Sequence, residues 1–266
     1  MNKLVFGLIA TVIFVNGLSA NTGQKNHESI VRKKTALYYA GADVSSGWGC
    51  AQAGAVLGPL GVSAGAVLGG LCGTTWAYYW DNRNSQLPLK INQPADEFAF
   101  TFKNEYERCG YLHNKFSSEF LNKNLVKFNS ASEFLDEFYE PLCQMVSKEY
   151  KIDITVLKKV YTKESLVKML NKYTEISLLE NDEEIIKRMT LIVSEKSGNV
   201  KLANRYSLTM KSLYKSYENP NFKIDEFCSL ELNSIAISDE FNKEEKEVIK
   251  NSIHILKYSF SLWNAN

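Results

Sequence analysis

An uncharged stretch at residues 48–80 constrains the fold of this chain more than any other feature. Its glycines recur at intervals of four residues, and residues four apart lie on one face of a helix. A stripe of glycine lets a second backbone approach closely, which offsets the low helix propensity of glycine. We therefore predict a glycine-zipper segment whose contact face is formed by Gly54, Gly58, Gly61, Gly65, Gly69 and Gly73.

Three arrangements of this segment fit its composition. A single membrane-spanning helix suits the length and the aromatic ends, but Pro59 breaks or kinks a helix, and the basic cluster at 32–34 would remain on the exported side. A helical hairpin turning at residues 59–61 would bring Cys50 and Cys72 level, so that a disulfide could join its arms. The third arrangement is a helix pair inside the protein's own core. We favour the hairpin, and whether lipid or protein covers it stays open.

The first 20 residues have the features of a secretory signal peptide. Lys3 precedes an apolar run of about twelve residues, which is too short to span a bilayer, and small residues up to Ala20 suit cleavage. We therefore expect export to the periplasm, the cell envelope or the medium. Disulfides persist in such compartments, and because the chain has five cysteines, at least one is free or pairs between chains.

Charge balance and motif content exclude several classes of function. Cleavage would remove Lys3 and leave 30 of the 31 basic residues against 30 acidic ones, so we expect no nucleic-acid partner. The sequence contains no Cys-x-x-Cys pair, no phosphate-binding loop, and no Gly-x-Ser-x-Gly or His-Glu-x-x-His motif. We therefore expect no metal site and no cofactor, and we assign no catalytic residue.

Two polar segments flank the zipper. Residues 21–47 are interpreted as a polar leader or linker, and residues 81–94, with two prolines and several asparagines, as a second linker. From residue 95 to residue 266 apolar residues recur with helical spacing, and strand-like alternation is nowhere sustained. The predicted fold class is all-α: a Gly/Ala-rich helical hairpin, or a kinked span, plus a bundle-like domain of about six amphipathic helices.

Helix boundaries in the second part of the chain are indicated by capping residues. Ser130, Asn181 and Asn242 each stand three residues before a glutamate, as in a capping box. Pro141 is expected to interrupt the helix that starts after Ser130, because proline lacks the backbone N–H.

A polar cluster near the start of the helical region is the candidate site. On a helix, Tyr106, Gly110 and His113 share one face, while Glu107 and Asn114 share the adjacent one. We favour a buried hydrogen-bond network that orients neighbouring helices, with Gly110 admitting another backbone. The alternatives are a ligand or partner site, or an acid–base pair of Glu107 and His113.

This cluster and the zipper together resemble a poorly characterised family of exported bacterial proteins. Members of that family carry a Gly/Ala-rich zipper, followed by a motif of the form Asn-Pro-Tyr-Asp, a few residues, Gly, two residues and His-Asn. In this chain Glu105 replaces the proline and Glu107 the aspartate, and the matching residues are Asn104, Tyr106, Gly110, His113 and Asn114. The resemblance implies an architecture and no reaction.

These features predict an exported, non-enzymatic protein. Residues 48–80 would associate with membrane lipid or with a second copy of the chain, while the helices after them form a soluble domain. One alternative is a helical interaction module that binds a protein or peptide partner and keeps the zipper buried. A second alternative is a hydrolase-type site built on His113 and Glu107.

Overall fold

The structure, a computed structural model, describes residues 36–82, 102–121 and 128–264. The regular elements in these ranges are all helical, which confirms the predicted all-α class. Residues 36–54 are helical and lead through a 3-10 turn, η1 (Ala55–Leu57), into the long helix α2 (Gly58–Asn82). The later helices are α3 (Glu105–Leu121), α4 (Ala131–Tyr150), α5 (Ile154–Val160), α6 (Lys163–Ile176), α7 (Asp182–Ser197), α8 (Val200–Tyr217), α9 (Ile224–Ile237) and α10 (Lys243–Trp263).

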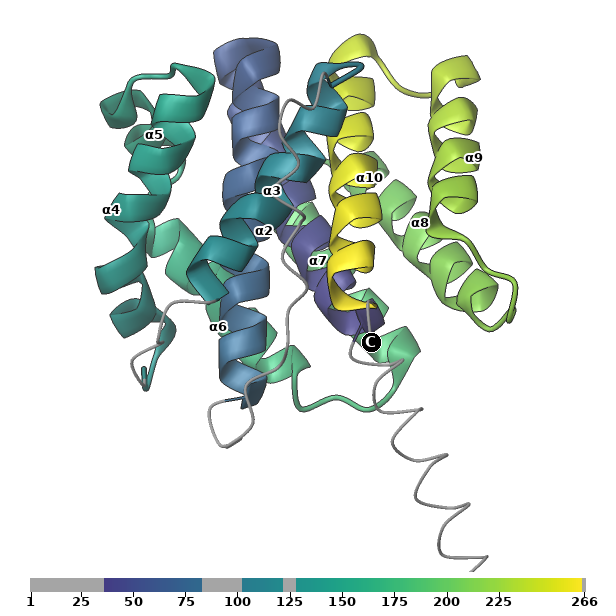
Figure 1. Cartoon of the computed structure of the whole chain (residues 1–266), viewed down its shortest axis with the longest axis horizontal. Coiled ribbons are helices and arrows are strands. Elements are labelled where there is room, and N and C mark those ends of the chain that lie inside the picture. Colours follow the sequence, from purple (N-terminus) through teal and green to yellow (C-terminus); the bar gives the residue numbers. More distant parts are fainter. Residues whose placement is uncertain (1–35, 83–101, 122–127, 265–266) are drawn as a thin grey trace, which may run out of the picture.

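Residues 36–54 and α2 form an antiparallel helical hairpin in the middle of the molecule (Figure 1). The chain reverses at η1 and at Gly58, whose φ of 76° favours glycine. The predicted turn at residues 59–61 is therefore a few residues too late. Pro59 does not break the hairpin arm because it is the second residue of α2, where a missing N–H costs no helical hydrogen bond.

The glycines of α2 lie against the backbone of the first arm. A Cβ atom at Gly65 would collide with the carbonyl oxygen of Cys50, and one at Gly69 with that of Ser46. At Gly73 it would lie 2.9 Å from the carbonyl oxygen of Ala42. The four-residue spacing from Gly61 to Gly73 is therefore the spacing at which the two arms touch. Gly58, which was also predicted on the contact face, lies at the turn, and no atom comes within 4 Å of its Cβ position.

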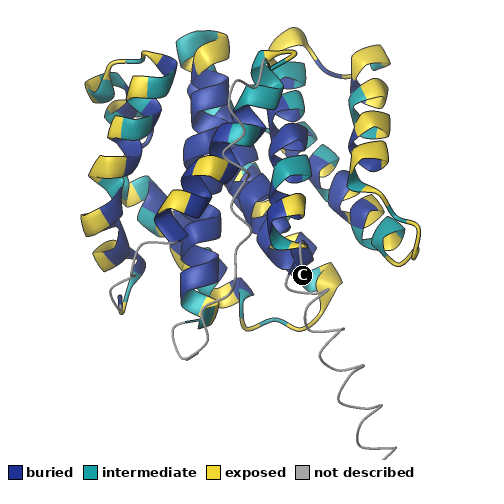
Figure 2. Ribbon diagram, viewed as in Figure 1, coloured by how far each residue is buried: buried dark blue, intermediate teal, exposed yellow. Residues whose placement is uncertain are grey.

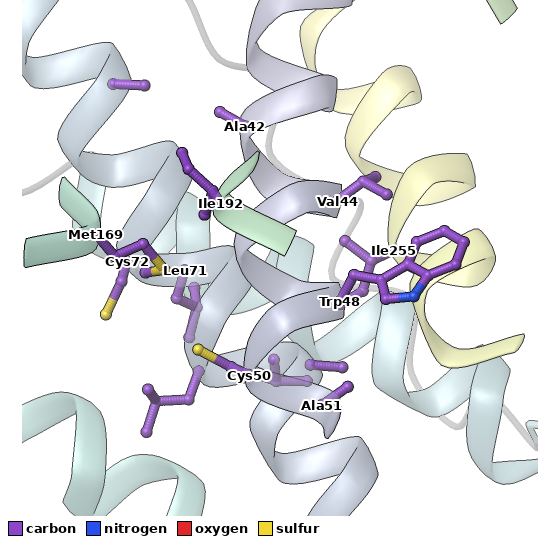
Figure 3. Close-up of a cluster of buried hydrophobic side chains, with 14 of the residues drawn as sticks. Ala42, Val44, Trp48, Cys50, Ala51, Leu71, Cys72, Met169, Ile192 and Ile255 are labelled. Atoms are coloured by element: carbon purple, nitrogen blue, oxygen red, sulfur yellow. The ribbon is translucent and has the colours of Figure 1, made fainter. Parts of the chain in front are cut away.

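The way in which residues of the two arms pair keeps Cys50 and Cys72 apart. Cys50 lies opposite Gly65, whereas the predicted disulfide required it to lie opposite Cys72. Both thiols are free and buried, so the expected Cys50–Cys72 bond is absent, and the chain's other cysteines are free as well. Figure 3 shows Cys50 on one arm and Cys72 on the other, among apolar side chains of the core.

The remaining helices enclose the hairpin. Helix α2 packs against α3, α4, α6 and α10, and every residue from Gly61 to Tyr79 is buried (Figure 2). The first arm contacts Tyr173 of α6, Lys196 of α7 and Tyr206 of α8. In this structure protein covers the hairpin, so it is the core around which the other helices form a sheath.

Several boundaries differ from those expected. Residues 36–47, assigned from the sequence to a polar leader, are helical and buried, because one aspartate and two serines do not prevent an otherwise apolar segment from packing. Eight helices, α3 to α10, follow the hairpin in the described ranges, compared with about six predicted. Helix α5 has only 7 residues, and α9 buries only Phe227, Cys228 and Ile235. The predicted signal peptide and most of the linker at 81–94 lie outside the described residues.

The predicted helix starts are confirmed. Ser130 and Asn181 accept hydrogen bonds from the backbone N–H three residues later, and Asn242 forms a complete capping box with Glu245. The predicted break at Pro141 is wrong, because α4 continues through it. Pro141 and Glu137, whose carbonyl group loses its partner there, are both exposed, so water can replace the missing bond.

Candidate functional site

A single charged residue lies between residues 36 and 80, and it marks the candidate site. That residue is Asp43, in the first arm of the hairpin, and its side chain is fully buried. An isolated buried carboxylate costs several kcal/mol, so a partner is needed. Asp43 was not among the predicted site residues, because residues 21–47 were interpreted as a leader. Its position inside an otherwise uncharged run from 36 to 80 could have indicated a buried site.

His113 of α3 faces this carboxylate. The Nε2 atom of His113 lies 3.4 Å from Oδ1 of Asp43, and neither side chain is exposed to solvent. The contact has the distance of an ion pair without hydrogen-bond geometry. The other ring nitrogen, Nδ1, lies 3.1 Å from Oδ1 of Asn114. The histidine therefore has a polar side chain next to each ring nitrogen, and its contact with Asp43 joins α3 to the hairpin.

Helix α10 completes the network. The hydroxyl of Ser259 donates to Oδ2 of Asp43, and the indole N–H of Trp263 lies 3.4 Å from the same oxygen. The side-chain amide of Asn114 donates to the carbonyl oxygen of Tyr258 at 2.6 Å. These contacts thus join three parts of the fold: the hairpin, α3 and α10.

The two ionisable groups change each other's protonation. Burial raises the pKa of the Asp43 carboxyl, and the His113 ring and the hydrogen bonds from α10 oppose this shift. Burial alone would lower the pKa of His113, but the Asp43 carboxylate and the Asn114 side chain outweigh it, so the pKa of His113 lies above its usual value. The charged form of each group therefore depends on the other.

Two glycines make room for this arrangement. A Cβ atom at Gly70 of α2 would lie 2.7 Å from Cδ2 of His113. One at Gly110 of α3 would lie 2.7 Å from the carbonyl oxygen of His254 in α10. Gly110 thus admits another backbone, as the sequence suggested, and Gly70 allows the imidazole to reach the hairpin.

The other candidate residues lie away from the buried pair. The hydroxyl of Tyr106 donates to the Glu247 carboxylate at 2.7 Å, and its ring stacks on His254 with centroids 5.7 Å apart. Glu107 accepts a hydrogen bond from the backbone N–H of Lys103 at 3.0 Å and so helps to cap α3.

Glu107 and His113 do not form the acid–base pair considered from the sequence. They stand six residues apart on α3, which places them on different sides of the helix. Glu107 is engaged at the start of α3, whereas His113 is buried against Asp43. The geometry therefore separates the two groups on which a hydrolase-type site depended.

Comparison with family models, characterised proteins and solved structures finds no match to this chain. The resemblance to a family of exported bacterial proteins therefore stays a prediction. Within the described ranges, no three His, Cys, Asp or Glu side chains come together in a group that could hold a metal ion. What the site can do chemically is to exchange protons and to hold the hairpin against α3 and α10.

Proposed function

We propose that this protein is an exported, non-enzymatic protein that inserts its central hairpin into membranes. The observation that carries the proposal is that residues 36–80, which form nearly the whole hairpin, contain one charged residue, Asp43. Among the described helices, Ala36–Asn82 is the one long and apolar enough to cross a membrane, although core helices of soluble proteins pass the same test.

The dimensions of the hairpin support this proposal. The described part of the first arm, residues 36–54, is about 28 Å long at 1.5 Å per residue. Helix α2, with 25 residues, is about 37 Å long. The hydrocarbon core of a bilayer is about 30 Å thick. Each arm therefore has the length needed to span a bilayer.

The chemistry of the arm-to-arm contact also supports it. Gly65 and Gly69 bring the two backbones together by close packing, which persists in lipid, where no hydrophobic force acts between helices. Apolar side chains of α2 such as Leu68 and Leu71 are buried in the core, and insertion would bring such side chains into contact with lipid. We therefore expect the hairpin to move as one unit.

The tip of the hairpin is exposed to solvent. Val56 is 78% exposed and Leu60 is 49% exposed, and neither has a charged neighbour in the turn sequence. An exposed apolar tip is suited to first contact with a bilayer surface. Export, as predicted from residues 1–20, would bring this tip to a cell envelope or to a foreign membrane.

Flotation of the mature chain with vesicles of phosphatidylcholine and phosphatidylglycerol tests the proposal. We expect the wild-type chain to float with the vesicles and Val56→Asp to stay largely in the soluble fraction. Leu208→Asp is the matched control, since Leu208 is 62% exposed and belongs to α8, not to the hairpin. Failure of the wild-type chain to float, or equal flotation of the Val56 and Leu208 variants, would contradict insertion through the tip.

A second candidate function is a helical module that binds a protein or peptide partner and keeps the hairpin buried. The observation that favours it is a set of exposed apolar residues on the outer helices: Leu208 on α8, and Leu230 and Ile237 on α9, which are 62%, 70% and 84% exposed. This function predicts that charged substitutions on α9 abolish partner binding, while Val56→Asp leaves it intact.

A further inference from the structure

We infer that the Asp43–His113 contact is a latch that holds the hairpin inside its sheath at neutral pH and releases it to a membrane in acid. This inference rests on the proposed insertion of the hairpin. Three observations carry it: Asp43 is the single charged residue between residues 36 and 80, its partner belongs to a different helix, and both side chains are fully buried.

The position of Asp43 makes its charge an obstacle to insertion. It lies fourteen residues before Leu57 in the turn, so about 21 Å of helix separate it from the tip at 1.5 Å per residue. A bilayer core is about 30 Å thick, so insertion of the arm carries this side chain into hydrocarbon. A carboxylate is costly there, whereas a protonated carboxyl group has no charge.

In the sheath, contacts that lipid does not offer reduce the cost of the same charge. His113 faces one carboxylate oxygen, while Ser259 and Trp263 reach the other. Among the described residues, the remaining ionisable neighbour is Tyr173 of α6, whose buried phenol has a raised pKa and is neutral near pH 7. From helix α2, Gly70 approaches this site and carries no charge. The charged form of Asp43 therefore favours the sheathed state.

The direction of the pH effect follows from the two environments of Asp43. In lipid the carboxyl loses His113 and both hydrogen-bond donors, so its pKa rises above the value it has in the sheath. Insertion therefore takes up a proton, and falling pH favours it. His113 acts in the opposite direction only between its usual pKa of about 6.5 and its raised value in the sheath. Below about pH 6 it is protonated in both states, and Asp43 alone determines the trend.

Quenching of tryptophan fluorescence by brominated lipid measures insertion in the full mature chain, because Trp48, Trp76 and Trp80 lie on the hairpin. The vesicles contain brominated phosphatidylcholine and phosphatidylglycerol, at pH 7.5 and pH 5. We expect the inserted-to-sheathed ratio of the wild-type chain to rise on acidification. The rise is at most about tenfold for each unit by which lipid raises the pKa of Asp43.

Three variants separate the latch from general weakening of the fold. Asp43→Asn has no charge to remove, so we expect it to insert at pH 7.5 and to show little change at pH 5. His113→Gln leaves the carboxylate unpaired and should also insert at pH 7.5. Ser63→Ala is the matched control: it removes a 3.0 Å hydrogen bond from the hairpin to Asn251 of α10 but no ionisable group, so it should keep the wild-type pH profile.

Each outcome decides between the two proposals. Retention of the wild-type pH profile by Asp43→Asn, or equal quenching of the wild-type chain at both pH values, overturns the latch but leaves insertion standing. Absence of quenching from every chain at both pH values overturns insertion, and the latch with it. Circular dichroism checks the fold; if Asp43→Asn loses its helical signal, His113→Gln decides, and a wild-type profile in that variant overturns the latch.

Discussion

Two contacts of the hairpin are built from opposite chemistry. Between its own arms, glycines such as Gly65 and Gly69 meet backbone carbonyl groups and leave no space for a side chain. Between the hairpin and its sheath, the Asp43 carboxylate meets the ring of His113. Close packing is insensitive to pH and to the surrounding solvent, whereas a buried ion pair depends on both. The contact between the arms should therefore be independent of pH, whereas the Asp43–His113 contact should not be.

The largest expected loss of folding stability comes from removing the His113 side of the ion pair. His113→Ala leaves the Asp43 carboxylate buried without its partner, which costs about 3–5 kcal/mol for a pair of this kind. Urea denaturation followed by circular dichroism measures the loss. The double variant Asp43→Asn with His113→Gln is the control, since it removes both charges, and it should recover part of the stability. No recovery in the double variant would mean that packing, and not charge, sets the cost.

A smaller loss of folding stability is expected when a side chain is added at the contact between the two arms. Gly65→Val places side-chain atoms against the Cys50 carbonyl group and the Tyr161 hydroxyl, and overpacking of this kind costs about 1–3 kcal/mol. Urea denaturation at pH 6 and pH 8 should give the same loss, because no charge is involved. As a control, Val56→Ala at the exposed tip should change stability by less than about 0.5 kcal/mol. A pH-dependent loss in Gly65→Val would contradict the contrast between the two contacts.

The smallest effect is a dependence of stability on pH. Because the pKa of His113 is raised in the folded state, its contribution is fully present below the unfolded value of about 6.5. That contribution is lost as pH rises through the folded pKa. We expect the free energy of unfolding from urea denaturation to fall between pH 6.5 and pH 8, by up to about 1.4 kcal/mol per unit of pKa shift, and the urea midpoint to fall with it. In Asp43→Asn the carboxylate that raises this pKa is gone, so the fall should disappear; a midpoint that still falls would assign it to other groups.

The pH dependence of folding stability differs from that of the proposed membrane insertion. Unfolding transfers the pair to water, whereas insertion would transfer Asp43 to lipid. Unfolding in water returns His113 and Asp43 to their usual pKa values, and since both are raised in the fold, acid does not weaken this pair. The proposed insertion would move Asp43 into lipid, where its pKa would rise further. The same pair would therefore resist unfolding in acid and, under that proposal, permit transfer to a bilayer.

The sequence determined those features that depend on a few neighbouring residues. Ser130, Asn181 and Asn242 start helices because each can cap the turn that follows it. The four-residue glycine spacing identified the contact face of α2, since helical periodicity is a local property. The cluster from Tyr106 to Asn114 was visible as a candidate site, although only His113 and Asn114 belong to the buried network.

Tertiary structure alone decided the register of the hairpin, the covering of its surface and the partner of Asp43. Turning at Gly58 rather than at residues 59–61 moved Cys50 opposite Gly65 and away from Cys72, a change of a few residues that no local rule specifies. Asp43 and His113 are seventy residues apart in the chain. They meet because α3 packs against α2 beside the first arm, and such an arrangement depends on the packing of the whole bundle rather than on the preference of any one segment.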